Sequence, residues 1–353
     1  MNNDNWYQEQ FFNDEFDYPR CENCGNPKIE AGYEMKLCKE CREKLYRKPY
    51  PILIKLLGVA IVAVVIIALI HFPSSLNAGI AYERGLQAES EGKYVTAMKE
   101  YKKVVKRFPD STIALASLFV TSYQNGEIDD LNALYDKLEG EEITDDSLVD
   151  KVNRTVDCWN KYYYISDELD NILQKAKNMD NDKAISLFQE YMNKNPEDIS
   201  SATYYYGILL YDIGELQKAK KVIEGALKSN PDNYEGQLLQ AEIYSEMGEY
   251  QKATDCCNYV LKHNVEYSYA YDTLARVELM NHEDKKGLKT ARKAFQLNQK
   301  DSGIVATLAI AYHYNHNTRE RDAMLKKFKK FKDDNTYDLD LMEGIFSGDY
   351  QWR

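Results

Sequence analysis

The sequence predicts an all-α protein: a solenoid of paired helices, preceded by one transmembrane helix and a small cysteine-rich module. Three observations lead to this prediction. The C-terminal part superimposes on itself after a shift of 34 residues, an apolar run occupies residues 52–70, and two pairs of cysteines precede that run. The chain has 353 residues and a formal net charge of −12, a length that leaves room for two or three domains.

Residues 52–70 read ILIKLLGVAIVAVVIIALI, and only Lys55 interrupts the apolar run. At about 1.5 Å per residue, a helix of this length spans roughly 28 Å, close to a hydrocarbon core of about 30 Å. Lys55 lies near one end, where its amine can reach the headgroups. A cleaved signal peptide and a buried core helix are the alternatives, but the long cysteine-containing segment upstream disfavours the first. The low mean hydropathy of the chain, −0.60, disfavours the second. We therefore expect a transmembrane helix over residues 51–72.

Basic residues are concentrated before this run and scarce after it. From residue 71 to 92 the only Lys or Arg is Arg84. This asymmetry predicts a single-pass protein of the cell membrane, with a cytoplasmic N-terminus and an extracytoplasmic C-terminal domain. Clustered thiols before the run agree, because they persist best in a reducing compartment. The basic flank comprises Lys36, Lys39, Arg42, Lys44, Arg47, Lys48 and Lys55, against Glu40 and Glu43.

The two cysteine pairs have the spacing of a metal site. Each pair is a CxxC motif, so that both thiolates can approach one ion. Four thiolates at about 2.3 Å close a tetrahedral Zn²⁺ site with no open position for catalysis. Residues 21–45 resemble a small zinc ribbon, which implies a structural zinc; a thiol redox pair or an iron–sulfur site is the alternative. A module this small depends on its metal for folding. The four candidate ligands are Cys21, Cys24, Cys38 and Cys41.

Residues 1–20, before the first cysteine pair, interleave acidic and aromatic side chains without a clear period. This composition predicts a disordered tail. The alternative is a short segment that docks a cytoplasmic partner.

Small residues recur with the 34-residue period. Gly207, Ala241, Ala275 and Ala309 align, and each unit reads as a helix, a turn, a second helix and a short loop. The small residues lie where two antiparallel helices cross closely, and Pro231 follows a second helix, which it cannot continue. One helix pair cannot bury its apolar face alone, so the units are expected to stack. The best-matching units are 200–233, 234–267, 268–301 and 302–335.

These patterns resemble the tetratricopeptide repeat (TPR) family. An earlier copy covers residues 78–111, and a weaker one covers about 165–198. Residues 112–164 depart from the pattern and are expected to hold a degenerate or inserted repeat. The solenoid is expected over residues 76–335, with residues 336–353 as a cap. In the earlier copy the family positions are held by Gly85, Gly92, Ala97, Tyr101 and Pro109.

The resemblance implies that a concave groove, lined by the first helix of each unit, binds a protein or peptide. The aligned set is aromatic and acidic, and it lacks the Lys, Arg and Asn run of TPR domains that grip a peptide C-terminus. A basic or tyrosine-stacking partner is favoured; alternatively, many of the tyrosines only pack between repeats. The candidates are Tyr204, Ile208, Tyr211, Asp212, Leu238, Glu242, Ser245, Glu246, Tyr269, Asp272, Arg276, Leu279, Met280, Ile310, His313 and Tyr314.

Other chemistry is not evident in the sequence. The motifs of nucleotide-binding loops, serine hydrolases and zinc proteases are absent. His313 and His316 have no third ligand nearby in sequence, and a surface pair is expected. Cys158, Cys256 and Cys257 are expected to be buried free thiols. The acidic C-terminal part disfavours nucleic acid as a partner.

We therefore expect a non-enzymatic, membrane-anchored scaffold for a protein or peptide. The alternative is a sensor that couples an extracytoplasmic TPR domain to a cytoplasmic docking module. Such coupling through one helix requires oligomerisation, and the small-residue pairing that favours helix dimers is not met, because Val62 lies four residues after Gly58. The oligomeric state is not predicted. A composition rich in Asn, Lys, Tyr and Ile favours a bacterial source.

Overall fold

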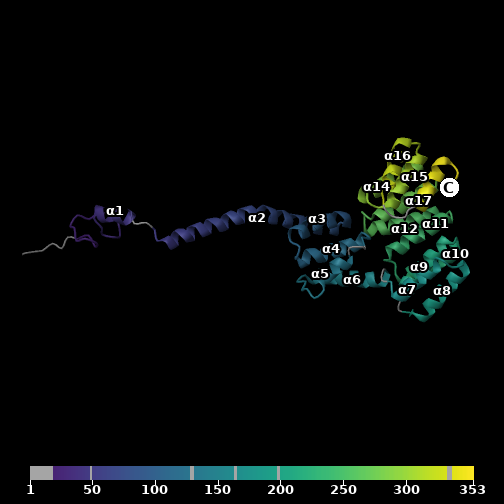
Figure 1. The fold of residues 1–353 in the computed structure, drawn as a ribbon, viewed down its shortest axis with the longest axis horizontal. Coiled ribbons are helices and arrows are strands. Elements are labelled where there is room, and N and C mark those ends of the chain that lie inside the picture. Colours follow the sequence, from purple (N-terminus) through teal and green to yellow (C-terminus); the bar gives the residue numbers. More distant parts are fainter. Residues whose placement is uncertain (1–18, 48–49, 128–130, 163–164, 197–198, 332–335) are drawn as a thin grey trace, which may run out of the picture. The chain divides into compact units, whose positions relative to one another are not determined.

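The computed structural model describes residues 19–47, 50–127, 131–162, 165–196, 199–331 and 336–353 (Figure 1). Within these ranges all regular secondary structure is helical. Nearly all of the predicted tail, residues 1–18, lies outside the described residues. The chain divides into two compact units, Met1–Pro73 and Ser74–Arg353.

The first unit contains the cysteine module, which consists of turns and one helix. The N–H of Gly25 donates to the carbonyl of Cys21 at 2.8 Å, and Gly25 has a φ of +74°, a conformation that glycine adopts readily. Helix α1 (Lys39–Arg47) carries the last cysteine. Two backbone hydrogen bonds, Glu22 to Lys36 and Glu30 to Leu37, join the two halves. No strand is present in residues 19–47.

Helix α2 (Ile52–Ser90) contains the apolar run. Among the described residues it is the one helix long and apolar enough to cross a membrane, with a mean hydropathy of 3.1 over its most apolar window. None of that window is buried; Leu53 and Leu69 are 74% and 67% exposed. A long apolar helix without a protein partner matches the composition of a membrane span. The same helix continues to Ser90 and so supplies the first helix of the first repeat.

The second unit is a solenoid of helix pairs, which confirms the predicted all-α fold. The first helix of a pair packs on both helices of the pair before it, as α13 does on α11 and α12, and α15 on α13 and α14. Helix α6 (Asp146–Tyr162) stands between pairs, and α17 (Thr336–Ser347) follows the last one. The pairs are the end of α2 with α3 (Tyr94–Arg107), α4 (Thr112–Gln124) with α5 (Leu131–Leu138), α7 (Asp167–Ala176) with α8 (Asn181–Lys194), α9 (Ile199–Asp212) with α10 (Leu216–Ser229), α11 (Tyr234–Glu246) with α12 (Tyr250–His263), α13 (Ser268–Met280) with α14 (Asp284–Leu297), and α15 (Ser302–Tyr314) with α16 (Thr318–Phe328).

The helices of a pair cross so closely that only a small residue fits at the crossing. A Cβ atom added to Gly207 would lie 2.3 Å from Cδ1 of Ile223, and one on Gly85 would lie 2.4 Å from Cε1 of Tyr101. Tyr101 and Ala97 are fully buried. The periodic glycines and alanines of the sequence therefore mark the crossings.

The turn between the helices of a pair also repeats. Gly214 and Gly248 have φ values of +78° and +76°. The N–H of the next residue returns to the carbonyl five positions earlier, as from Glu215 to Leu210 at 2.8 Å, which is a Schellman cap. His282 and His316 occupy the same position one and two periods later, with φ values of 59° and 58°. The sequence prediction that His316 forms a surface pair with His313 missed this role as a turn residue.

The first pair packs against the middle of the solenoid. Val265 donates its N–H to the carbonyl of Gly92 at 3.0 Å. Glu266 accepts hydrogen bonds from the backbone N–H and the hydroxyl of Thr96 at 2.8 and 2.9 Å, and Asn264 Nδ2 donates to the carbonyl of Gln124 at 2.6 Å. These contacts join residues 140 to 173 positions apart in the sequence.

The C-terminal segment covers the last pair. Met342 and Ile345 of α17 are 1% and 3% exposed. Trp352 stacks on Tyr314 with ring centroids 6.0 Å apart, and Arg353 Nη2 donates to Asp284 Oδ2 at 3.1 Å. The apolar end of the solenoid is thereby shielded from water, as a stacked array requires.

We expect His316→Gly to stabilise the protein by up to about 1 kcal/mol, because glycine adopts a positive φ without the steric cost of a Cβ atom. His263→Gly is the control, since His263 ends α12 in a helical conformation and its ring packs on Tyr234 and Tyr259; glycine there should destabilise by at least about 0.5–1 kcal/mol. Urea denaturation of both variants measures the difference. Destabilisation by His316→Gly comparable to that of the control would contradict the turn assignment.

Candidate functional site

A pocket with a volume of about 310 Å³ opens between α9, α11 and α13, the first helices of three successive pairs. Carboxylates, tyrosines and one arginine converge on it, together with a few aliphatic side chains. Convergent polar groups in a concave site are the usual mark of a binding site. The lining residues are Tyr204, Ile208, Tyr211, Asp212, Glu235, Leu238, Leu239, Glu242, Tyr269, Asp272, Thr273 and Arg276.

The structure brings together most of the residues that the sequence analysis aligned along the groove. From this set the pocket holds Tyr204, Ile208, Tyr211, Asp212, Leu238, Glu242, Tyr269, Asp272 and Arg276.

His313 and Tyr314 lie elsewhere, under the C-terminal segment. His313 stacks on Phe346 at 5.1 Å, and the guanidinium of Arg353 lies 3.6 Å from the centre of the Tyr314 ring. Three further candidates are buried in the solenoid rather than open to a groove: Ser245, Leu279 and Ile310.

Glu235 lines the pocket but was not among the predicted residues. It lies in the first turn of α11, where an acidic residue is ordinarily explained by the helix dipole. Its Oε1 accepts a hydrogen bond from the Tyr267 hydroxyl at 2.5 Å, and burial raises its pKa. Only the packing of α11 against α13 could reveal that Glu235 belongs to the pocket.

Arg276 is the single cation among the lining residues, and it is already paired. Its guanidinium bonds to Glu242, and its Nε lies 3.5 Å from Asp272 Oδ2. Asp272 is only 6% exposed, and its Oδ1 has no hydrogen-bond partner among the described residues. Burial raises the pKa of Asp272 to about 6, against the opposing effects of Arg276 and the Thr307 hydroxyl.

The other carboxylates of this region repel one another. Asp212 and Glu246 are exposed, but partial loss of hydration, and then the negative charge of Glu242, raise the pKa of both carboxyls. Burial likewise raises the pKa of Tyr204 and Tyr211, so both phenols stay neutral. The pocket is therefore negative, partly dry and lined by neutral aromatic rings.

The cysteine module is a second candidate site. The four Sγ atoms predicted as ligands all lie within 4.8 Å of one another, and those of Cys24 and Cys38 are 3.6 Å apart. Cys24 is exposed, and the other three are buried. Asn23 Nδ2 lies 3.2 Å from Cys41 Sγ. Convergence of four sulfur donors fits a tetrahedral metal ion such as Zn²⁺.

Contacts around the sulfurs order the module. The N–H of Cys38 lowers the pKa of Cys21 to about 6. Against the opposing N–H of Asn26, the neighbouring thiols raise the pKa of Cys24. One sulfur of the cluster is therefore a thiolate more readily than another. Arg42 Nε donates to Glu30 Oε2 at 2.8 Å, and Nη2 donates to the carbonyl of Met35 at 2.8 Å. The same guanidinium lies 3.7 Å from the centre of the Tyr33 ring. The loop between the two CxxC motifs is thus tied to α1.

The remaining cysteines are free thiols within the solenoid. Only Cys257 is fully buried, as expected; Cys158 and Cys256 are half-buried, which corrects the prediction for these two. Cys158 Sγ lies 3.9 Å from Asp232 Oδ2. Burial raises the pKa of the Cys158 and Cys257 thiols. Both are therefore protonated and poorly reactive.

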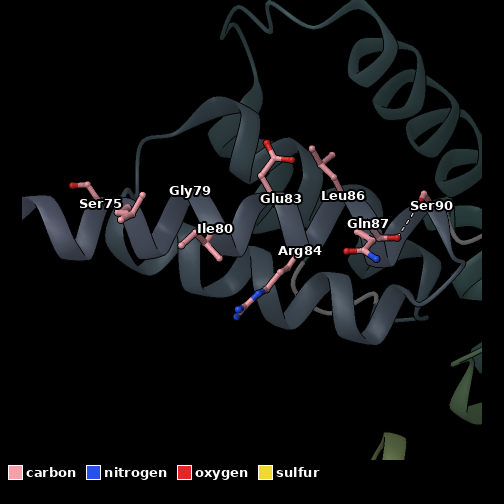
Figure 2. A pocket seen from close by; sticks show the side chains of 9 residues that line it. Ser75, Gly79, Ile80, Glu83, Arg84, Leu86, Gln87 and Ser90 are labelled. Atoms are coloured by element: carbon pink, nitrogen blue, oxygen red, sulfur yellow. Dashed lines mark hydrogen bonds between the residues drawn. The ribbon is translucent and has the colours of Figure 1, made fainter.

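An open groove also follows the exposed side of α2 (Figure 2), from Ser75 to Ser90. Leu76 and Ile80 are 50% and 41% exposed there, and the hydroxyl of Ser90 donates to the carbonyl of Gln87 at 2.7 Å. All of its lining residues come from one helix. Polar groups from different elements do not converge on it, and the α9–α11–α13 pocket is the stronger candidate.

Comparisons with known proteins agree with a TPR-type fold. A family model of the tetratricopeptide repeat matches residues 74–111, the earlier copy of the sequence analysis. No curated protein matches the chain.

Three solved structures illustrate the likeness. TTC0263, a thermophilic TPR protein of Thermus thermophilus, is 17% identical, with 50% of this chain and 97% of that chain covered and a TM-score of 0.44. A tetratricopeptide repeat protein from Parabacteroides merdae ATCC 43184 is 15% identical; 76% of this chain and 98% of that chain are covered, and the TM-score is 0.42. MamA 41-end from Desulfovibrio magneticus RS-1 is 16% identical; 47% of this chain and 96% of that chain are covered, and the TM-score is 0.36. Similarities with such low sequence identities and TM-scores carry no information about function.

The raised pKa of Asp272 predicts a pH-dependent stability. Between about pH 6 and pH 4 the folded protein binds a proton at Asp272 that the unfolded chain does not, so this residue's contribution improves as the pH falls. Asp272→Asn removes the titration. We therefore expect the stability of the variant relative to the native protein to fall by up to about 3 kcal/mol from pH 7 to about pH 4. Urea denaturation at both pH values measures it, and a difference independent of pH would contradict it.

Proposed function

We propose that this protein is a membrane-anchored scaffold, without catalytic activity, whose solenoid binds a protein or peptide partner in the α9–α11–α13 pocket. The observation that carries the proposal is the convergence of nine aligned residues, from three successive first helices, on one pocket. Helices that stack in register present their side chains to an extended partner as a continuous surface.

The membrane part of the proposal rests on α2 and on its flanks. None of the most apolar window of α2 is buried, and a lipid environment satisfies such a surface without a protein partner. The basic residues before it favour a cytoplasmic N-terminus, and the solenoid is then extracytoplasmic.

The metal part rests on the four converging sulfurs. Cys21, Cys24, Cys38 and Cys41 would hold a structural Zn²⁺, which would replace the missing hydrophobic core of this small module. Because all four positions around the ion are filled by the protein, the ion would have no place for a substrate.

One labelling experiment tests the orientation and the metal together. Cys24 is the exposed cysteine of the module, so a membrane-impermeant maleimide reports on it in a variant with Cys158, Cys256 and Cys257 replaced by Ala. We expect labelling only after the cells are permeabilised and a zinc chelator is added. Labelling of intact cells would refute the orientation, and labelling of permeabilised cells without chelator would refute the metal.

A photo-crosslinking amino acid in place of Ile208, which lines the pocket, tests partner binding in cells. We expect a discrete adduct with a partner protein, because the probe lies within a side-chain length of any segment held there. The control places the same probe at Asp255, an exposed position on α12. Identical adducts from both positions, or none from Ile208, would reject the pocket as the binding site.

A further inference from the structure

We propose that the α9–α11–α13 pocket receives a cationic side chain, Arg or Lys, from the partner segment. This inference rests on the proposed function and specifies the chemistry of the partner.

The first argument is charge. Asp212, Glu235, Glu242 and Asp272 line the pocket, and Arg276 is the single cation opposite them, so the lining carries a formal charge of −3. Glu246 adds a further carboxylate close by, because its pKa responds to Glu242. Among the described residues, Asp212 and Glu246 take part in no ion pair. Both side chains are exposed, and an incoming cation would relieve their repulsion from Glu242.

The second argument is the unpartnered oxygen of Asp272. This side chain lines the pocket and is 94% buried. The Thr307 hydroxyl acts on the carboxylate, yet Oδ1 accepts no hydrogen bond from any described residue. Buried polar atoms in folded proteins are nearly always hydrogen-bonded, and an exception points to a missing partner. Since the atom is a carboxylate oxygen, the missing partner is a donor, and a positively charged donor forms the strongest bond.

The third argument is shape and polarity. Ile208 and Leu238 provide apolar contacts for the aliphatic stem of a long side chain, and Tyr204 and Tyr211 present neutral rings to a cation. The volume of about 310 Å³ is at the lower limit for small-molecule sites, which favours a single side chain.

Arg276 indicates how such a group is held. Its guanidinium already bonds to Glu242 and lies close to Asp272 Oδ2, so these carboxylates are placed to accept a planar cation. An anionic ligand is disfavoured, because Arg276 is ion-paired with Glu242 and Asp272 and four carboxylates would repel the ligand. A segment without a donor would leave Asp272 Oδ1 unpaired.

The test uses the full-length protein in detergent micelles and a fluorescein-labelled peptide, (Arg-Ala)₄ amide, with binding followed by fluorescence anisotropy at near-physiological salt. Two comparison peptides replace Arg by citrulline, a neutral isostere, or by Glu. The test variant is Asp212→Asn with Glu242→Gln. The matched control, Asp136→Asn with Glu139→Gln, removes the same charge from exposed residues at the end of α5.

We expect the native protein to bind the Arg peptide in preference to both comparison peptides. The test variant should bind it about tenfold more weakly, which corresponds to about 1.4 kcal/mol, and the control should remain within about twofold of the native protein. Equal loss in both variants would assign binding to the general acidity of the surface and overturn the inference. Equal binding of the Arg and citrulline peptides, or no binding of the Arg peptide, would also overturn it.

Glu246→Lys is a second test variant, which keeps the inference testable if the double variant does not fold. Glu246 is exposed, so the substitution is tolerated sterically, and it places a competing cation beside the pocket; we expect a loss of similar size. The crosslinking experiment separates the two proposals. If the Ile208 adduct persists in the Asp212→Asn, Glu242→Gln variant, the proposed cationic side chain is refuted but partner binding stands. If no adduct forms in the native background, the binding function itself is refuted.

Discussion

The close crossing of the two helices in each pair is the constraint on which the rest of the solenoid depends. At Gly207 and Gly85 the facing side chain occupies the space that a Cβ would need. In later pairs Ala241 and Ala275 stand at this position and are fully buried. Because dispersion attraction falls steeply with distance, a gap here would forfeit contacts along both helices. The short distance between helices in turn fixes the surface on which the next pair stacks.

A second level of order comes from contacts between distant pairs. The turn after α4 lies against the middle of the solenoid, where a Cβ on Gly126 would be 3.0 Å from the Tyr267 hydroxyl and 3.3 Å from Cε2 of Tyr269. Tyr267 also donates to Glu235. Two residues of the pocket wall, Glu235 and Tyr269, are thus supported by a turn far earlier in the chain. This support pre-organises the pocket and lowers the entropic cost of binding.

The pocket concentrates negative charge where water is partly excluded. Such an arrangement is unfavourable for folding by itself, since desolvation and mutual repulsion both raise the pKa of the carboxyls. Arg276 compensates only part of this charge, through Glu242 and one oxygen of Asp272. Residual electrostatic cost at a concave site is typical of functional sites, where the ligand provides the missing compensation.

The helix pairs, the close crossings and the cysteine spacing could all be predicted from the sequence, because each depends on residues near one another in the chain. A small residue every 34 positions and two CxxC motifs leave few structural alternatives. The sequence also identified most of the pocket, since aligned positions on successive first helices face the same side. The tertiary structure alone decided that Glu235 joins the pocket, that Arg353 and its neighbours cover His313 and Tyr314, and that Gly92 meets Val265. Those outcomes depend on small rotations between pairs, which accumulate along the solenoid and are not encoded in any single repeat.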